Sequence, residues 1–314
     1  MIEPCKRVAA IGLVLAASAT QAQQAPPPPM PAPADVKVEA VDIAPGIYML
    51  TGRGGNIGLS VGVDGAAVID DQFADMNPKI RAAIAMLSDK PVSFVINTHL
   101  HGDHTGGNDA FGKAGAVIIA QENVRKRLAT AQINPSTQQK IEPRAREALP
   151  VVTFADSAAL HFNDEDLEFT HLPNAHTETD IIVRFRKANV VHMGDLFVGG
   201  FPFIDANTGG TLDGLIHAHE AVLASIDDDT RLIRGHGPLG NKAELQAFHD
   251  MLVIVRDRVA KLVKAGKSQE EVVAARPTRE FEEKYGGANF NAAEWIGRAY
   301  VGQKVALEKR RKKG

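Results

Sequence analysis

One segment, NTHLHGDHTGG, limits the folds open to this chain more than any other feature. It follows the apolar run Val92–Asn97, which is typical of a buried strand that ends at the edge of a sheet. In an extended segment the rings of His99 and His101 point the same way, because these residues are two positions apart. The adjacent side chains of Asp103 and His104 must diverge, so they cannot easily reach the same ion as the first pair. The spacing therefore indicates a site for two neighbouring metal ions.

Cysteine usage narrows the ligands available to such a site. The only cysteine is Cys5, which lies in a segment with the features of a cleaved secretory signal. Lys6 and Arg7 precede a short apolar run, and small residues follow it, so we expect cleavage after Ala22. The run is too short to span a bilayer, and stable membrane insertion is not expected. A mature chain without thiols is typical of a protein of the periplasm or the exterior of the cell. Without cysteine, the ligands must be histidine and carboxylate, which are compatible with zinc, iron or manganese.

The chain as a whole predicts one α/β domain with short extensions. We expect a signal peptide at residues 1–22, a proline-rich tether at 23–35, a folded domain at 36–308 and a basic tail at 309–314. Strand–helix–strand units in both halves of the domain, with hairpins between them, predict sheets covered by helices. Residues 131–150 are expected to form a loop, with a helix within it as the alternative.

The C-terminal part of the domain, from about residue 240 to 308, is predicted to be helical. Between Ala243 and Lys264 apolar residues recur at alternating three- and four-residue spacing, which predicts one amphipathic helix. Packing of this stripe on its own domain is the simpler interpretation, and a homodimer seam is the alternative. The formal charge of −3 and the pI of about 6.4 give no reason to expect nucleic acid as a partner.

Two glycine-containing loops are candidates for the rim of the site. The segment Gly52–Asn56 lies between predicted strands and lacks the third glycine of a dinucleotide-binding loop, so we interpret it as a hairpin loop. Arg53 within it could meet an anion or lie on the surface. The segment Gly199–Asp205 follows Asp195 and could form a substrate wall or ordinary packing.

Three further segments contain histidine or aspartate. PNAHTETD from Pro173 and MGD from Met193 adjoin predicted strands, and RGHGP begins at Arg234. Together with the motif at His99, and in this order, they resemble the motifs of the metallo-β-lactamase superfamily, which also contains thioesterases, lactonases and many other hydrolases. The resemblance covers about residues 40 to 240. It implies an α/β fold, namely a four-layer αβ/βα sandwich of two mixed β-sheets flanked by helices.

The resemblance also implies the roles of the site residues. One metal ion would be held by His99, His101 and His176, a second by Asp103, His104 and His236, with Asp195 as the bridge between them. The implied cofactor is a pair of Zn²⁺ ions. Asp103 would also act as a catalytic residue that orients the nucleophile.

The activity implied is metal-dependent hydrolysis. In this hypothesis the metal ions lower the pKa of a shared water, and the bridging hydroxide attacks the carbonyl of an ester, lactone, thioester or amide. The charge of two divalent ions exceeds that of the carboxylates and the hydroxide. The small-molecule substrate could therefore be anionic.

Other functions stay open. β-Lactam hydrolysis is one, but Asp195 stands where many lactamases of this superfamily have a cysteine, and the usual lysine after that position is absent. A mononuclear iron sulfur dioxygenase that acts on a persulfide is an alternative of another class, because that branch keeps the same motifs. A non-catalytic binding module is less favoured, because every ligand position is filled.

Several polar residues are expected to support the site. Asp70 ends a strand nearby and Asp180 follows the His176 loop, so each could contribute a hydrogen bond. His171 and His192 lie in strands that lead to the site and are interpreted as core or supporting residues. The remaining histidines are assigned to the surface or to packing: His161, His217, His219 and His249.

Overall fold

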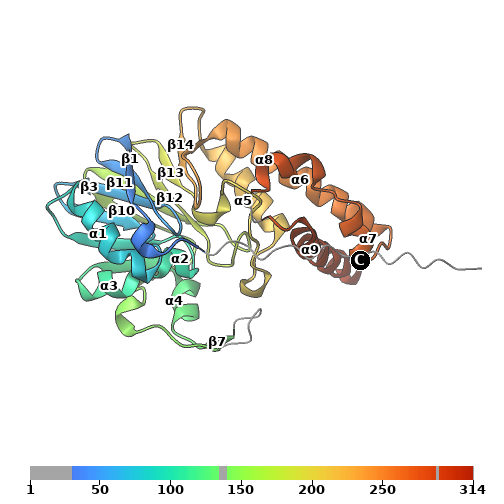
Figure 1. Cartoon of the computed structure of the whole chain (residues 1–314), viewed down its shortest axis with the longest axis horizontal. Helices are drawn as coiled ribbons and strands as arrows, with labels where there is room; N and C mark the ends of the chain where they lie inside the picture. The colour runs from blue at the N-terminus through green and yellow to red at the C-terminus, as the bar shows by residue number, and fades with distance from the viewer. Residues whose placement is uncertain (1–29, 134–139, 288–289, 314) are drawn as a thin grey trace, which may run out of the picture.

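The computed structural model describes residues 30–133, 140–287 and 290–313 (Figure 1). The predicted signal peptide, and the tether as far as Pro29, lie outside these residues. Two large sheets form the centre of the molecule. The first has the strand order β1-β2-β3-β4-β5-β6-β9, and the second has the order β10-β11-β12-β13-β14-β15.

The first sheet consists of β1 (Glu39–Ala44), β2 (Ile47–Thr51), β3 (Ile57–Gly62), β4 (Gly65–Ile69), β5 (Val92–Asn97), β6 (Val117–Gln121) and β9 (Val152–Phe154). The second consists of β10 (Ser157–Phe162), β11 (Glu165–His171), β12 (Ile181–Phe185), β13 (Val190–His192), β14 (Arg231–Ile233) and β15 (Gly240–Asn241). The helices are α1 (Asn77–Ala85), α2 (Gly102–Thr105), α3 (Asn108–Lys113), α4 (Glu122–Leu128), α5 (Leu212–Ser225), α6 (Lys242–Lys264), α7 (Gln269–Ala274), α8 (Glu282–Tyr285) and α9 (Ala292–Lys313).

Both sheets are mixed. In the first, β1 to β4 form an antiparallel meander, whereas β4, β5, β6 and β9 run parallel to their neighbours. In the second, β10 to β13 are antiparallel, and β14 joins β13 in parallel. Strands β5, β13 and β14 end at the loops that carry the predicted metal ligands.

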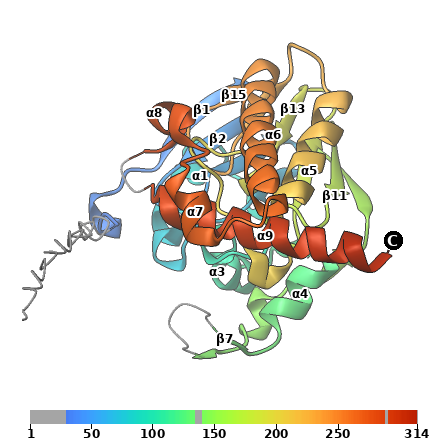
Figure 2. The same ribbon diagram turned by 90° about the vertical axis from the view of Figure 1, so that its right-hand side faces the viewer.

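The burial of apolar side chains produces four layers. Between the sheets, Ile69 and Ile96 of the first belong to one buried cluster with Phe169 and Val183 of the second. Helices α1 and α3 cover the outer face of the first sheet, α5 and α6 cover that of the second, and α9 packs on α6 and α7 (Figures 1 and 2). This arrangement confirms the predicted fold class.

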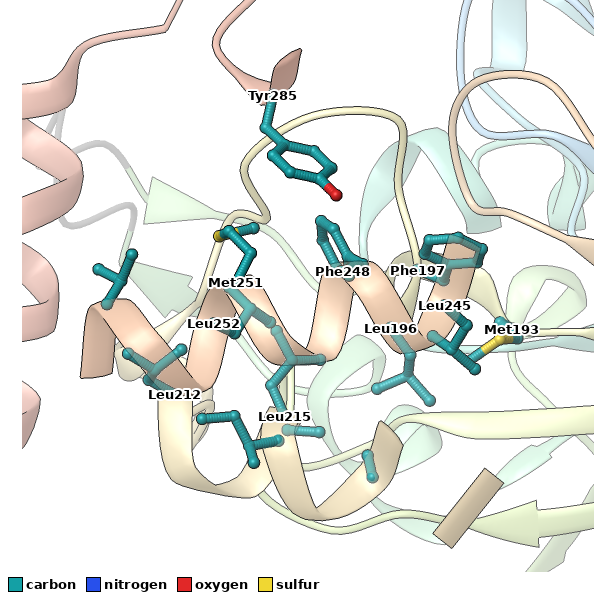
Figure 3. Close-up of a cluster of buried hydrophobic side chains, with 14 of the residues drawn as sticks. Met193, Leu196, Phe197, Leu212, Leu215, Leu245, Phe248, Met251, Leu252 and Tyr285 are labelled. Carbon is teal, nitrogen blue, oxygen red and sulfur yellow. The ribbon is translucent and has the colours of Figure 1, made fainter. Parts of the chain in front are cut away.

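The C-terminal helices pack on their own domain. Helix α6 begins with a capping box, in which the Asn241 side chain accepts from the Glu244 N–H and the Glu244 carboxylate accepts from the Asn241 N–H. Phe248 is fully buried near the middle of the cluster in Figure 3, with ring centroids 5.4 Å from Phe197 and 5.6 Å from Tyr285. The predicted apolar stripe of α6 therefore packs against its own domain, in agreement with the simpler interpretation.

Two predicted boundaries differ from the structure. The tether was expected to reach residue 35, but Pro33–Asp35 forms a 3-10 turn, and Nζ of Lys79 donates to the carbonyls of Ala34 and Val36 at 2.7 Å. The basic tail was expected from residue 309, but α9 continues to Lys313, since nothing in the lysine- and arginine-rich sequence opposes a helix.

The loop-like segment 131–150 contains a small strand pair, β7 (Gln132–Ile133) and β8 (Lys140–Ile141), and residues 134–139 between these strands lie outside the described part. Among the described residues, no helix combines the length and apolarity needed to cross a membrane.

Candidate metal centre

The predicted ligands lie on loops that follow strands of both sheets. His99 and His101 follow β5, and Asp103 and His104 lie in the short helix α2 directly after them. Gly102 is the first residue of this helix. From the second sheet, the loop between β11 and β12 contributes His176, the turn after β13 contributes Asp195, and the segment after β14 contributes His236. The structure brings all of these side chains together.

Three imidazoles and one carboxylate form the first ligand group. Nδ1 of His101 lies 3.2 Å from Nε2 of His99 and 2.9 Å from Nε2 of His176. Oδ2 of Asp195 lies 3.5 Å from Nε2 of His176 and 3.9 Å from Nε2 of His99. These four ligand atoms lie within 4.8 Å of one another, which is the spread that one small cation can bridge.

The second ligand group consists of Asp103, His104 and His236. Nε2 of His104 lies 3.4 Å from Nε2 of His236, and Oδ2 of Asp103 lies 3.2 Å from the latter. Asp195 faces this group as well, because its Oδ1 lies 3.2 Å from Nε2 of His104 and 3.4 Å from Nε2 of His236. The two oxygens of Asp195 are thus directed to different groups.

Hydrogen bonds on the far side of each ring set the tautomers of the first group. Thr98 Oγ1 donates to Asp70 at 2.7 Å, so it accepts from Nδ1 of His99 at 3.0 Å. Nδ1 of His176 donates to the carbonyl of Phe203 at 2.6 Å. Nε2 of His101, at 3.1 Å from the Asp205 carboxylate, donates to it. The remaining nitrogens, which face one another, therefore carry lone pairs.

Facing lone pairs repel unless a cation lies between them, so the donors fit a metal ion. Oδ1 of Asp195 supports the same conclusion, since it is buried and has no hydrogen-bond partner among the described residues. Nitrogen and oxygen donors without sulfur are compatible with zinc, iron or manganese.

Protonation of the imidazoles differs between the two groups. Burial lowers the pKa of His99 well below its usual value and lowers that of His176 to about 4, so both rings are neutral at pH 7. Burial also disfavours the charged form of His236, but the carboxylates of Asp103 and Asp195 beside its ring outweigh this effect and raise the pKa of His236 to about 9. A cation bound at the second group must displace this proton.

Zinc binding to the second group is therefore expected to release protons and to weaken with acidity. Below about pH 9, His236 carries a proton that zinc must replace. Burial lowers the pKa of His104, but Asp195 and Asp70 outweigh this and raise it well above its usual value, so His104 must release a proton as well. Affinity should therefore fall at least about tenfold for each unit by which the pH drops. Calorimetric titration in two buffers with different ionisation heats would measure the released protons. A binding heat that is independent of the buffer would contradict the expectation.

The sequence did not single out Asp205 as the partner of His101. Only its place in the proposed substrate wall drew attention to it, because an acidic residue in a loop has no distinctive local signal. Oδ2 of Asp205 accepts from His101, while Oδ1 accepts from the Asn207 N–H at 3.0 Å. The first contact orients the His101 ring, and the second fixes the loop.

Replacing Asp205 with asparagine is expected to weaken zinc binding about 10- to 100-fold. The amide can keep the contact with the Asn207 N–H, but its NH₂ group would oppose the N–H of His101 and favour the wrong tautomer. Competition with a zinc chelator would measure the change. Asp228→Asn, at a side chain 96% exposed, is the matched control and should bind like the parent.

Two glycines allow close contact with the ligands. A Cβ on Gly55 would lie 2.1 Å from the His104 ring, and one on Gly235 would lie 2.0 Å from Oδ1 of Asp195. Asn56 joins the same two segments, since its N–H donates to the Gly235 carbonyl at 2.6 Å. The loop Gly52–Asn56 therefore lies at the site, as predicted for its rim.

The predicted supporting carboxylates are in place. Asp70 accepts from Nδ1 of His104 at 2.7 Å and from the Thr98 N–H at 2.7 Å. Asp180 accepts from the Thr177 N–H at 2.7 Å and so fixes the loop of His176.

The other histidines have structural contacts. His171 lies 2.9 Å from the Glu178 carbonyl, and His192, which is buried, lies 3.2 Å from that of Asn56. His219 is buried and contacts the carbonyl of Leu196 at 2.5 Å. Contacts with neighbouring polar groups are also present at His161, His217 and His249.

A cavity of about 850 Å³ opens above the two ligand groups. Its floor includes His101, Asp103, Asp195 and His236. Its wall includes Val198, Gly199, Gly200, Phe201 and Phe203, so the segment after Asp195 does line it. Arg53 does not line it and forms an ion pair with Asp75 at 2.6 Å.

The fold and the ligand motifs define a class of proteins, and comparison with known families agrees. The chain belongs to the metallo-beta-lactamase superfamily, whose family profile matches residues 50–236. No curated protein sequence matches the chain.

Solved structures show the same fold. A metallo-beta-lactamase from Pontibacter korlensis superposes with a TM-score of 0.57 at 17% identity, over 69% of this chain and 99% of that one. The stereoselective inverting sec-alkylsulfatase Pisa1 from Pseudomonas sp. gives 0.62 at 17% identity, over 84% of this chain and 50% of that one. The DIM-1 metallo-beta-lactamase gives 0.55 at 14% identity, over 69% and 98%. The chain thus spans half the length of the alkylsulfatase, and at these identities the likeness concerns the fold alone.

Proposed function

We propose that this chain is a secreted or periplasmic metal-dependent hydrolase with two zinc ions, which acts on the carbonyl of a small ester, lactone, thioester or amide. The observation that carries the proposal is the position of Asp195. Its two oxygens face two complete sets of ligand atoms, so the chain provides for a pair of ions rather than for one. The solved relatives whose names denote hydrolases, a sulfatase and lactamases, support hydrolysis as the class of reaction.

The first three histidines would hold one ion and Asp103, His104 and His236 the other, with Asp195 between them. Two bound zinc ions would lower the pKa of a shared water toward neutrality and polarise the substrate carbonyl. The protein contributes fixed geometry, because each imidazole of the first group is oriented by an acceptor behind it.

Asp103 is suited to orient the nucleophile. Burial raises its pKa, but the hydrogen bond with His236 and the nearby His104 outweigh this and hold the pKa below its usual value. The carboxylate therefore stays ionised at neutral pH, and it lines the cavity. It can therefore accept a hydrogen bond from the attacking water and orient it toward the substrate.

Metal analysis combined with a substrate panel tests the proposal. The purified full chain should contain two zinc ions and should hydrolyse at least one of a carboxylic ester, a lactone, a glutathione thioester and nitrocefin. Removal of metal by a chelator should abolish turnover, and zinc should restore it. Turnover of nitrocefin alone would favour a β-lactamase. One iron per chain with oxygen uptake on a persulfide would replace the proposal with a dioxygenase.

The proposed location has its own test. When the chain is expressed in a bacterium with a periplasm, the mature protein should be recovered from the periplasm with Gln23 as its first residue. Mass spectrometry of the purified protein measures this directly. A cytoplasmic protein of full mass would contradict the assignment.

A further inference from the structure

We infer that the cavity above the metal centre selects substrates whose non-reacting part is uncharged and apolar, with Phe203 as a specificity-determining residue. This inference rests on the proposed function, because it concerns the group that the metal ions do not hold. The metal ions would bind the reacting carbonyl of the substrate, and the wall would contact the remainder of the substrate.

The composition of the cavity carries the first step. Beside the ligand side chains on its floor, the described lining consists of glycines and of Val198, Phe201 and Phe203. None of these described lining residues is lysine or arginine. A substrate carboxylate remote from the metal ions would therefore meet no cationic side chain among the described lining residues.

Two arginines near the site, Arg298 and Arg53, already have partners. Arg298 stacks on Phe203 at 4.9 Å and bonds to Glu294 at 2.8 Å, and it lines a neighbouring groove along α9 instead. Arg53 is paired with Asp75 at 2.6 Å. Moving a carboxylate from water to an apolar wall without a partner is unfavourable, so the wall discriminates against it.

Phe203 is placed to contact the substrate. Its ring centroid lies 6.0 Å from that of His101 and 6.0 Å from that of His176, both in the first ligand group. Arg298 stacks on its ring, but the residue is still 48% exposed, so part of the ring is accessible to an apolar group. Its main-chain carbonyl accepts from Nδ1 of His176 at 2.6 Å, which fixes the distance between this part of the wall and the metal centre.

The C-terminal helices hold the rest of the wall. Phe201 stacks on Phe290 with centroids 4.3 Å apart, and its N–H donates to the Tyr285 carbonyl at 2.8 Å. Trp295 of α9 donates from Nε1 to the Pro202 carbonyl at 2.8 Å. The wall is thus a rigid surface, which is what recognition by shape and apolarity requires.

A binding experiment with hydroxamic acids tests the inference, since hydroxamates bind zinc without being hydrolysed by this reaction. Three probes share the zinc-binding group: benzohydroxamic acid, its 4-carboxy derivative and acetohydroxamic acid, which lacks the ring. Calorimetry on the zinc-loaded full chain should show at least tenfold weaker binding for the carboxylated probe than for benzohydroxamic acid. The zinc content of every sample is measured in parallel.

Variants at Phe203 test whether this residue is the source of the selectivity between the probes. Phe203→Ala should weaken benzohydroxamic acid about tenfold and leave acetohydroxamic acid unchanged, because only the ring contact is lost. Phe203→Leu should restore most of the affinity, and Phe203→Lys should reverse the order of the two aromatic probes. Val63→Ala, at a residue 78% exposed in the turn between β3 and β4, is the control and should bind like the parent.

The outcomes separate the two proposals. A chain that binds two zinc ions but binds both aromatic probes equally, or prefers the carboxylated one, overturns the inference and leaves the proposed function intact. The same holds if Phe203→Ala weakens all three probes alike. A chain that retains no zinc overturns the proposed function and this inference together.

Discussion

Replacing Asp195 with alanine is expected to lower the zinc content below one ion per chain and to reduce hydrolysis by at least about 10³-fold. Among the described residues, Asp195 is the only carboxylate whose oxygens face both ligand groups, at 3.2 Å from Nε2 of His104 and 3.5 Å from Nε2 of His176. Its removal takes a donor and a negative charge from each group. A loss of about 10³ corresponds to roughly 4 kcal/mol of transition-state stabilisation, which is within the range for metal-assisted hydrolysis.

Elemental analysis and turnover of the best substrate from the panel measure the two effects in the same preparation. Asp228→Ala, which removes an exposed carboxylate that bonds to Lys242, controls for the change of residue type. Parent-level turnover by an Asp195→Ala protein that holds no metal would refute metal-dependent catalysis.

Replacing Phe248 with alanine is expected to destabilise the protein by about 3–5 kcal/mol. The side chain is fully buried in α6 and packs among Phe197, Tyr285 and His219, so its removal leaves a cavity that a rigid cluster cannot close (Figure 3). Denaturant unfolding of the parent and the variant measures the difference.

A control on the same helix separates packing from helix propensity. Ile254 is 39% exposed, and Ile254→Ala should change the free energy of unfolding by less than about 1 kcal/mol. Equal destabilisation by the two substitutions would show that the cluster is not the source of the stability.

Long elements with a clear period were predictable from the sequence. The strand Val92–Asn97 is observed with the predicted ends, and the helix expected between Ala243 and Lys264 is observed at Lys242–Lys264. The strand Arg231–Ile233 was not predicted, because three residues are too few to show a period. It becomes a strand through its parallel pairing with β13, which is a tertiary contact.

The candidate site could also be predicted only in part. The motif from His99 to His104 and the three distant segments could be recognised, because metal ligands must be of particular residue types at particular spacings. The acceptors behind the rings could not all be recognised. His176 uses the main-chain carbonyl of Phe203, which any residue would provide, and Asp205 becomes a partner of His101 only through folding.

Each ligand group takes side chains from both sheets, and this has a mechanical consequence. A bound ion would cross-link the two halves of the sandwich at their loop edge, in addition to the apolar interface between them. Because metal binds the folded chain more tightly than the unfolded one, its binding free energy adds to the resistance of the halves to separation. A shortage of metal would then shorten the lifetime of the folded protein as well as lower its catalytic activity.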